Sequence, residues 1–211
     1  MDYWRSHIQE LLRNILPGEF SHRKMLPLQR DLTLPDGALD AIKVSGVLLI
    51  IIPHKEELLT CLIKRPDHMK IHPGQIGLPG GKQEEKDETP RHTALRETSE
   101  EIGIFPEDMK ILGSLSPLYV SVSQYLIHPY VAWCHSMPEF TLNYSEVEKL
   151  ILLPVIPCMQ NAFTVEREVE TFTGKMKVPG FFYKNEFIWG ATAMILKEFF
   201  DILGSKPINQ E

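Results

Sequence analysis

The chain has 211 residues, with 22 Lys and Arg against 28 Asp and Glu, which gives a formal net charge of −6. This length is typical of one domain that buries its own core without disulfide or metal crosslinks. The acidic balance argues against broad electrostatic binding to nucleic acid, which requires a basic face. Three cysteines, odd in number and far apart, exclude a disulfide framework and a Cys-x-x-Cys metal site, and favour a reducing, cytoplasmic compartment.

The N-terminal segment predicts a helix followed by an irregular connector. The helical spacing over residues 2–16 is carried by Trp4, Ile8, Leu11, Leu12 and Ile15. Pro17-Gly18 ends this pattern, and residues 19–40 hold proline and scattered charge, as connectors do. No signal peptide is apparent, and the longest apolar stretch, Val47 to Pro53, is far shorter than the roughly 20 residues of a membrane helix. We therefore expect no membrane association.

The remaining chain predicts interleaved strands and helices. Runs of β-branched residues predict strands over residues 43–53 and 57–64. Further β-like segments lie near residues 110–116, 126–134, 150–154, 163–172, 177–183 and 186–189. An amphipathic final helix is predicted over residues 190–203. We expect an α/β or mixed α+β domain. The expected organisation is an N-terminal helix and connector (1–40), the domain itself (41–204) and a frayed tail (205–211).

Three glutamates lie on one face of a predicted helix that follows a Gly-, Pro- and His-rich loop at residues 66–88. Thr89 is a suitable N-cap, Pro90 suits the first helical position, and the helix runs to about Ile102 and stops at Gly103. At about 100° per residue, the face within one arc of roughly 100° holds Glu97, Glu100 and Glu101.

Carboxylates at this spacing repel one another and destabilise a helix. A hard divalent cation such as Mg²⁺ or Mn²⁺ offsets this repulsion, because it prefers carboxylate oxygens. The alternative at this stage is an acidic helix face that is simply solvated.

The residues around this helix resemble the Nudix box, G-x5-E-x7-R-E-U-x-E-E-x-G-U. The matching positions are Arg96, Glu97, Glu100, Glu101, Gly103 and Ile104. Thr98 replaces the aliphatic residue of the pattern, and the front half, counted from Gly81, is one residue longer. Either Asp87 or Glu88 therefore takes the first acidic position, where we expect it to pair with Arg96.

The segment of residues 65–81 is similar to the signature that precedes the box in coenzyme A pyrophosphatases. The matching residues are Arg65, His72, Gly74, Gln75, Pro79, Gly80 and Gly81, whereas Pro66, Lys70 and Leu78 depart from it. Residues 115–119 and 188–193 also look like that subfamily. The resemblance therefore covers most of residues 43–203.

The resemblance implies a Nudix fold, with a mixed β-sheet sandwiched between helices, and hydrolysis of a pyrophosphate bond that depends on Mg²⁺ or Mn²⁺. The implied substrate is coenzyme A or a derivative, cleaved to 3′,5′-ADP and 4′-phosphopantetheine or its acyl form. The implied metal ligands are Glu97, Glu100, Glu101 and the carbonyl of Gly81. The implied catalytic residues are Arg96, Glu100 and Glu101, and the implied substrate contacts are Arg65, Lys70, His72 and Gln75.

The general base stays open among Glu100, Glu101, Glu146 and Glu148. Two other functions also stay open: a Nudix hydrolase for ADP-ribose or a nucleoside triphosphate, and a non-catalytic Nudix-fold module that binds nucleotides. The His-x-Gly-Gln segment weighs against the first, and the intact glutamates weigh against the second. We expect a small-molecule substrate as partner, with neither nucleic acid nor membrane, and leave open a homodimer.

Overall fold

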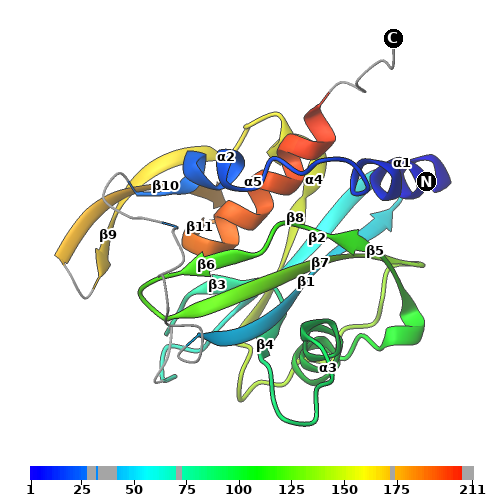
Figure 1. The fold of residues 1–211 in the computed structure, drawn as a ribbon, viewed down its shortest axis with the longest axis horizontal. Helices are drawn as coiled ribbons and strands as arrows, with labels where there is room; N and C mark the ends of the chain where they lie inside the picture. The colour runs from blue at the N-terminus through cyan, green and yellow to red at the C-terminus, as the bar shows by residue number, and fades with distance from the viewer. Residues whose placement is uncertain (28–31, 33–41, 70–72, 172–173, 206–211) are drawn as a thin grey trace.

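Two β-sheets form the framework of the computed structural model, which describes residues 1–27, 32, 42–69, 73–171 and 174–205 (Figure 1). The larger sheet contains β1 (Lys43–His54), β2 (Glu57–Lys64), β3 (Ile76–Gly77), β4 (Gly80–Lys82), β5 (Met109–Ser114), β6 (Leu118–Val120), β7 (Tyr125–Cys134) and β8 (Lys149–Pro154). Its main strand order is β3-β2-β1-β7-β5, with β4 on β1, β6 on β7 and β8 on β2. The smaller sheet is antiparallel, in the order β11-β10-β9, and contains β9 (Thr164–Thr171), β10 (Gly174–Tyr183) and β11 (Glu186–Trp189).

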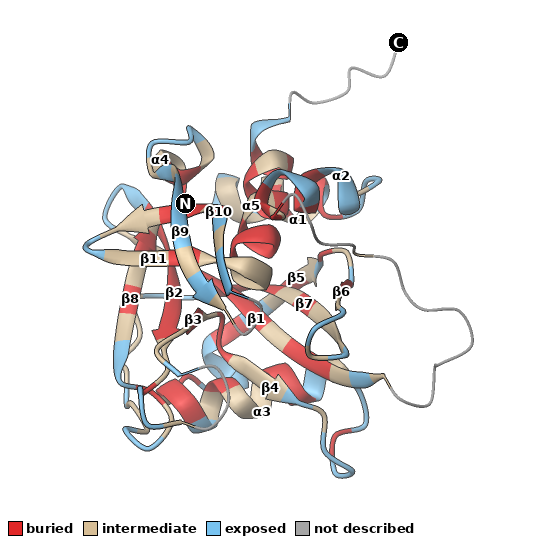
Figure 2. Cartoon of the chain, turned by 90° about the vertical axis from the view of Figure 1, so that its left-hand side faces the viewer, coloured by how far each residue is buried: buried red, intermediate tan, exposed pale blue. Residues whose placement is uncertain are grey.

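The central strand β1 makes the larger sheet mixed, because it pairs antiparallel with β2 and parallel with β7. All five side chains from Leu48 to Ile52 are fully buried, as expected for a strand that is covered on both faces. Leu49 and Ile51 join the hydrophobic cluster on one face, and Leu48, Ile50 and Ile52 join the cluster on the other. Figure 2 shows this burial along the centre of the sheet.

Helices cover both faces of the larger sheet. One face carries α3 (Pro90–Ile102), and the opposite face carries α1 (Asp2–Leu11), α2 (Glu19–His22) and α5 (Gly190–Gly204) (Figure 1). The predicted mixed sheet between helices is therefore confirmed. Helix α3 lies so close to β1 that a Cβ atom added to Gly46 would stand 1.8 Å from the carbonyl oxygen of Pro90. Glycine at this position allows the sheet and α3 to approach each other.

The N-terminal segment differs from its prediction. Helix α1 ends at Leu11, not at residue 16, and the Ile15 side chain is fully exposed. The predicted connector contains α2 and a 3₁₀ turn at Arg23–Met25 within its described residues. The physical reason lies in α5, because its buried Glu198 accepts hydrogen bonds from the Gly18 N–H (3.1 Å) and shares one with His22 (3.0 Å). The chain leaves the helix early to reach these partners.

Several short elements were not predicted. They are β3 and β4 within the predicted loop, β6, the helix α4 (Val155–Met159) and the 3₁₀ turn Pro106–Asp108. Each is too short to display a hydrophobic period, and pairing with a neighbouring strand or packing defines it instead. The other predicted strands and the final helix are confirmed, with ends that shift by up to three residues. Among the described residues, no helix combines the length and the apolar character that crossing a membrane requires.

Candidate metal centre

Helix α3 forms with the caps that its sequence predicts. The Thr89 hydroxyl oxygen accepts a hydrogen bond from the His92 N–H (3.3 Å), Pro90 is the first helical residue, and Gly103 ends the helix in the left-handed conformation at φ +72°. Thr98, which departs from the aliphatic position of the Nudix box, is buried and donates its hydroxyl to the Ala94 carbonyl at 2.7 Å. The departure therefore leaves no unpaired polar group in the core.

Three carboxylates meet beside α3, and they come from two separate segments. Glu97 and Glu101 lie one turn apart on the helix, and Glu146 lies in the segment before β8. One carboxylate oxygen of each residue lies within 4.8 Å of the others. The sequence marked Glu146 only as one candidate base among four, because no local pattern joins it to a helix more than 40 positions earlier.

Backbone hydrogen bonds hold the segment that carries Glu146 against the end of α3. The Thr141 N–H donates to the Ile102 carbonyl and the Asn143 N–H donates to the Glu101 carbonyl, both at 3.0 Å. The Glu146 N–H then closes a turn on the Asn143 carbonyl at 2.9 Å. These bonds use the carbonyl groups that a helix leaves unpaired at its C-terminus. They bring the third carboxylate to the other two.

Glu101 is the most buried member of the three, at 1% exposed. Its carboxylate accepts the Gly80 N–H at 2.9 Å, and the Arg65 Nη1 atom lies 3.9 Å from its other oxygen. Burial raises the pKa of Glu101 to about 8, with the charges of Glu97 and Glu146 adding to the rise and the Gly80 and Arg65 contacts opposing it. Burial also raises the pKa of Glu97. Burial, more than the neighbouring charges, thus disfavours the ionised forms of these two carboxylates.

These residues fit a divalent cation. They offer hard oxygen ligands from three carboxylates, which is the donor set that Mg²⁺ and Mn²⁺ prefer. The main chain of Gly81 lies directly against this group, since an added Cβ atom would stand 2.5 Å from the Glu97 carboxylate. The Arg65 Nε atom is buried and has no hydrogen-bond partner among the described residues. The site therefore has both acidic ligands and an adjacent unsatisfied donor for an anion.

Arg96 connects the loop before α3 to the helix. Its guanidinium donates to both carboxylate oxygens of Asp87, at 2.9 and 2.8 Å, and to Glu97 and Glu100, each at 2.9 Å. Glu100 is half exposed in this ion pair and lies outside the group of three carboxylates. Among the described residues, Glu100 is thus an ion-pair partner of Arg96 alone. Glu97 both pairs with Arg96 and belongs to the carboxylate cluster, which consists of Glu97, Glu101 and Glu146.

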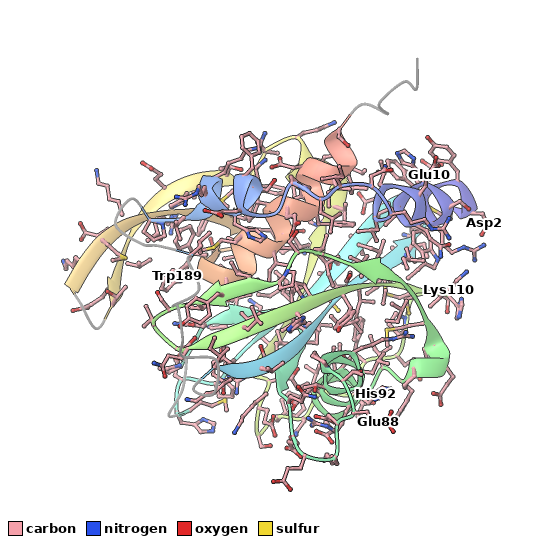
Figure 3. The ribbon with its side chains drawn as sticks, viewed as in Figure 1. Asp2, Glu10, Glu88, His92, Lys110 and Trp189 are labelled. Carbon is pink, nitrogen blue, oxygen red and sulfur yellow. The ribbon has the colours of Figure 1, made fainter. Side chains whose placement is uncertain are left out.

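The structure distinguishes the two candidates for the first acidic position. Asp87 is buried, pairs with Arg96 through two oxygens and also accepts the Thr93 hydroxyl at 3.0 Å. The Arg96 guanidinium holds the pKa of Asp87 well below its usual range. Glu88, by contrast, is 84% exposed and lies 3.7 Å from His92 on the outer side of α3 (Figure 3). Asp87 therefore takes the position.

The predicted substrate contacts are only partly within the described residues. Arg65 directly follows β2, and its N–H donates to the Gln75 carbonyl at 2.9 Å, so both residues stand at the end of the β2–β3 pair. The Arg65 side chain reaches the cluster, whereas the contact given for Gln75 is through its main chain. Lys70 and His72 lie outside the described residues.

Comparisons with known proteins show which sequences and folds this chain resembles. Residues 43–150 match the NUDIX domain family. A relative named "Uncharacterized Nudix hydrolase NudL" from Pectobacterium atrosepticum is 32% identical over 77% of this chain and 84% of its own length. A relative of the same name from Yersinia pestis is 31% identical over 90% of this chain and 96% of its own.

Among solved structures, the MutT protein from Methanosarcina mazei superposes with a TM-score of 0.51 at 19% identity, covering 78% of this chain and 96% of that one. At this identity the likeness shows the fold alone. The match over half of the chain and the two relatives show more, because they include the glutamate helix and the strands that support it. The chain therefore belongs to the Nudix hydrolase family.

Proposed function

We propose that this protein is a Mg²⁺- or Mn²⁺-dependent pyrophosphohydrolase that cleaves coenzyme A or a derivative to 3′,5′-ADP and 4′-phosphopantetheine or its acyl form. One observation carries the proposal: the Arg65 guanidinium lies 3.9 Å from Glu101, which forms a carboxylate cluster with Glu97 and Glu146. Arg65 opens the segment of residues 65–81 that is similar to the coenzyme A pyrophosphatase signature. The carboxylates proposed as metal ligands therefore lie next to the segment that is similar to the signature.

In this proposal Glu97 and Glu101 would hold the cation, with the Gly81 main chain beside them and Glu146 facing the same site. A bound divalent cation would offset the charge of the phosphates and lower the pKa of a water. The Arg65 guanidinium suits a phosphate oxygen, because its planar donors match phosphate geometry. In the balanced reaction, the water oxygen bonds to one phosphorus, the bridging oxygen leaves with the other phosphate, and a protein carboxylate accepts the proton.

Glu146 is the favoured proton acceptor among the four candidates. Glu100 is engaged by Arg96, Glu148 contacts Lys64 at 3.3 Å, and Glu101 is enclosed between Gly80 and Arg65. Glu146 is half-buried at the cluster, with no ion-pair partner within 4.0 Å among the described residues. A carboxylate in this position can accept a proton without first breaking a salt bridge.

The remaining roles follow the family pattern. Asp87 and Arg96 fix the loop before α3 to the helix, and Arg96 also orients Glu97. The substrate contacts proposed for Lys70, His72 and Gln75 rest on the resemblance of residues 65–81. In this proposal they and Arg65 would supply cationic and polar groups to a substrate with several phosphates.

The test is a substrate panel of coenzyme A, acetyl-coenzyme A, ADP-ribose, NADH and dGTP with Mg²⁺ or Mn²⁺, with products identified by mass spectrometry. We expect wild type to release 4′-phosphopantetheine or its acetyl form. Glu101→Gln removes one charge from the cluster, so we expect turnover to fall at least 100-fold, within the range for lost charge stabilisation. Glu88→Gln is the matched control, because Glu88 is an exposed carboxylate just before the same helix, where its only ion pair among the described residues is with His92.

The outcomes separate the three functions considered. Turnover of ADP-ribose or a nucleotide alone would keep the hydrolase and remove the coenzyme A assignment. Binding of coenzyme A without turnover of any substrate would favour the non-catalytic module. Equal activity of Glu101→Gln and wild type would show that the carboxylate cluster has no role in catalysis.

A further inference from the structure

Two lysines face each other at the strand ends nearest the candidate site. Lys64 is the last residue of β2, Lys149 is the first residue of β8, and the two are cross-strand partners. Like charges directly opposite each other on neighbouring strands destabilise the pairing. A negative charge at this position would offset that repulsion.

That charge comes from the smaller sheet. Glu186, the first residue of β11, places its Oε1 atom 3.2 Å from the Lys149 Nζ atom and 3.8 Å from the Lys64 Nζ atom. In Figure 2 β11 lies beside β2 and β8. The Glu186 side chain is only 16% exposed, whereas that of Glu148, which contacts Lys64 alone, is 42% exposed. Among the described carboxylates, only Glu186 bridges both lysines.

These strand ends lead directly into the candidate site. Arg65 follows Lys64, and its guanidinium reaches Glu101. Glu146 stands three residues before Lys149 and joins the carboxylate cluster. The two ends are also linked to each other, since the N–H of the residue before Lys149 donates to the Lys64 carbonyl at 2.8 Å. The lysine pair therefore stands next to both residues that approach the cluster from this side.

We infer that Glu186 is a positioning residue for the metal centre. By bridging Lys64 and Lys149 it fixes the strand ends from which Arg65 and Glu146 reach the cluster, without contacting the cluster itself. The inference rests on the proposed function, because that proposal makes the cluster a metal site. It extends the proposal by including a residue of the smaller sheet, which lies beyond the matched residues 43–150.

The test measures Mn²⁺ affinity by calorimetry, without any substrate. Glu186→Gln keeps the shape of the side chain but leaves the two lysines uncompensated, so we expect the Mn²⁺ dissociation constant to rise about tenfold, as for outer-shell residues of metal sites. We expect kcat for any substrate found in the panel to fall by a similar factor. The thermal midpoint should stay within about 3 °C, because the bridge is partly exposed.

The matched control is Glu168→Gln, which removes the partner of Lys175 (3.4 Å) from the exposed hairpin of the same sheet. We expect its Mn²⁺ affinity to equal that of wild type. The decisive variant combines Glu186→Gln with Lys149→Gln. It removes one of the two like charges, so affinity should return to within about twofold of wild type, as coupled neighbouring sites allow.

Wild-type Mn²⁺ affinity in Glu186→Gln would overturn the inference, and so would a double variant that binds Mn²⁺ no better than the single one. Glu186→Asp keeps the charge but shortens its reach, so an intermediate loss is expected and serves if Glu186→Gln does not fold. Failure of the proposed function would appear differently, as a wild type that binds Mn²⁺ but cleaves no member of the panel.

Discussion

At the scale of single residues, the burial of Glu101 has a cost that a bound cation would remove. Its pKa of about 8 lies above the ordinary 4.5, so the folded state disfavours the ionised form. Below pH 4.5 the protonated side chain carries no such cost. The free energy of unfolding therefore falls as pH rises from 4.5 through 8. Without metal, we expect Glu101→Gln to be more stable than wild type at pH 8 by about 1–3 kcal/mol, with the difference shrinking towards pH 5. Urea unfolding with chelator present measures this.

Adding Mn²⁺ should reverse that order. A ligand that binds only the folded state stabilises it, so wild type should gain stability with rising Mn²⁺ and the variant should gain little. If metal-free Glu101→Gln were less stable than metal-free wild type at pH 8, the Glu101 carboxylate would stabilise the fold without a cation. The site would then not need a cation to offset its charge.

At the scale of elements, α3 holds its glutamates in place through a close approach to β1. A Cβ atom at Gly46 would lie 1.8 Å from the Pro90 carbonyl oxygen, and this oxygen is backbone and cannot turn aside. We expect Gly46→Ala to destabilise the fold by about 3 kcal/mol, the upper range for overpacking, and to weaken Mn²⁺ binding because α3 must shift. Thermal unfolding and Mn²⁺ titration test both effects.

The control for this prediction is Gly77→Ala, since nothing lies within 4 Å of the added Cβ atom and the backbone there needs no left-handed conformation. It should unfold at the wild-type temperature within about 3 °C. If Gly46→Ala behaved like this control, β1 and α3 would have to be less tightly packed than their distance indicates.

At the scale of the whole molecule, Glu198 joins three distant segments. This fully buried side chain of α5 accepts the N–H groups of Gly18 and Ser116 and pairs with His22. Removing one partner of a buried polar group leaves the others unsatisfied, so we expect Glu198→Ala to lower the free energy of unfolding by about 3–5 kcal/mol. The exposed Glu10→Gln should have no measurable effect. Denaturant unfolding compares the two.

The same variant separates stability from function. Helix α5, which carries Glu198, lies on the face of the sheet opposite α3 (Figure 1), so the folded fraction of Glu198→Ala should bind Mn²⁺ with wild-type affinity. A large loss of affinity would instead mean that the N-terminal segment and the metal centre are coupled through the sheet.

Features that depend on neighbouring residues could be predicted from the amino-acid pattern alone. Helix α3 begins at Pro90 and ends at Ile102 as predicted, because its caps and period are local, and the spacing of Glu97 and Glu101 follows from that helix. Strand β2 likewise has its predicted bounds. The helix predicted to residue 16 was wrong, since propensity gave way to the buried partners of Glu198.

Which distant groups meet follows from the packing of the folded chain. It selected Asp87 over Glu88 for Arg96, brought Glu146 to the helix that carries Glu101, and set Glu186 between two lysines of the other sheet. The composition of the chain and the spacing of these residues are the same whether or not the residues are in contact, so neither predicts the contacts. Strand pairing and the packing of α3 bring them together, and these depend on contacts between residues far apart in the chain.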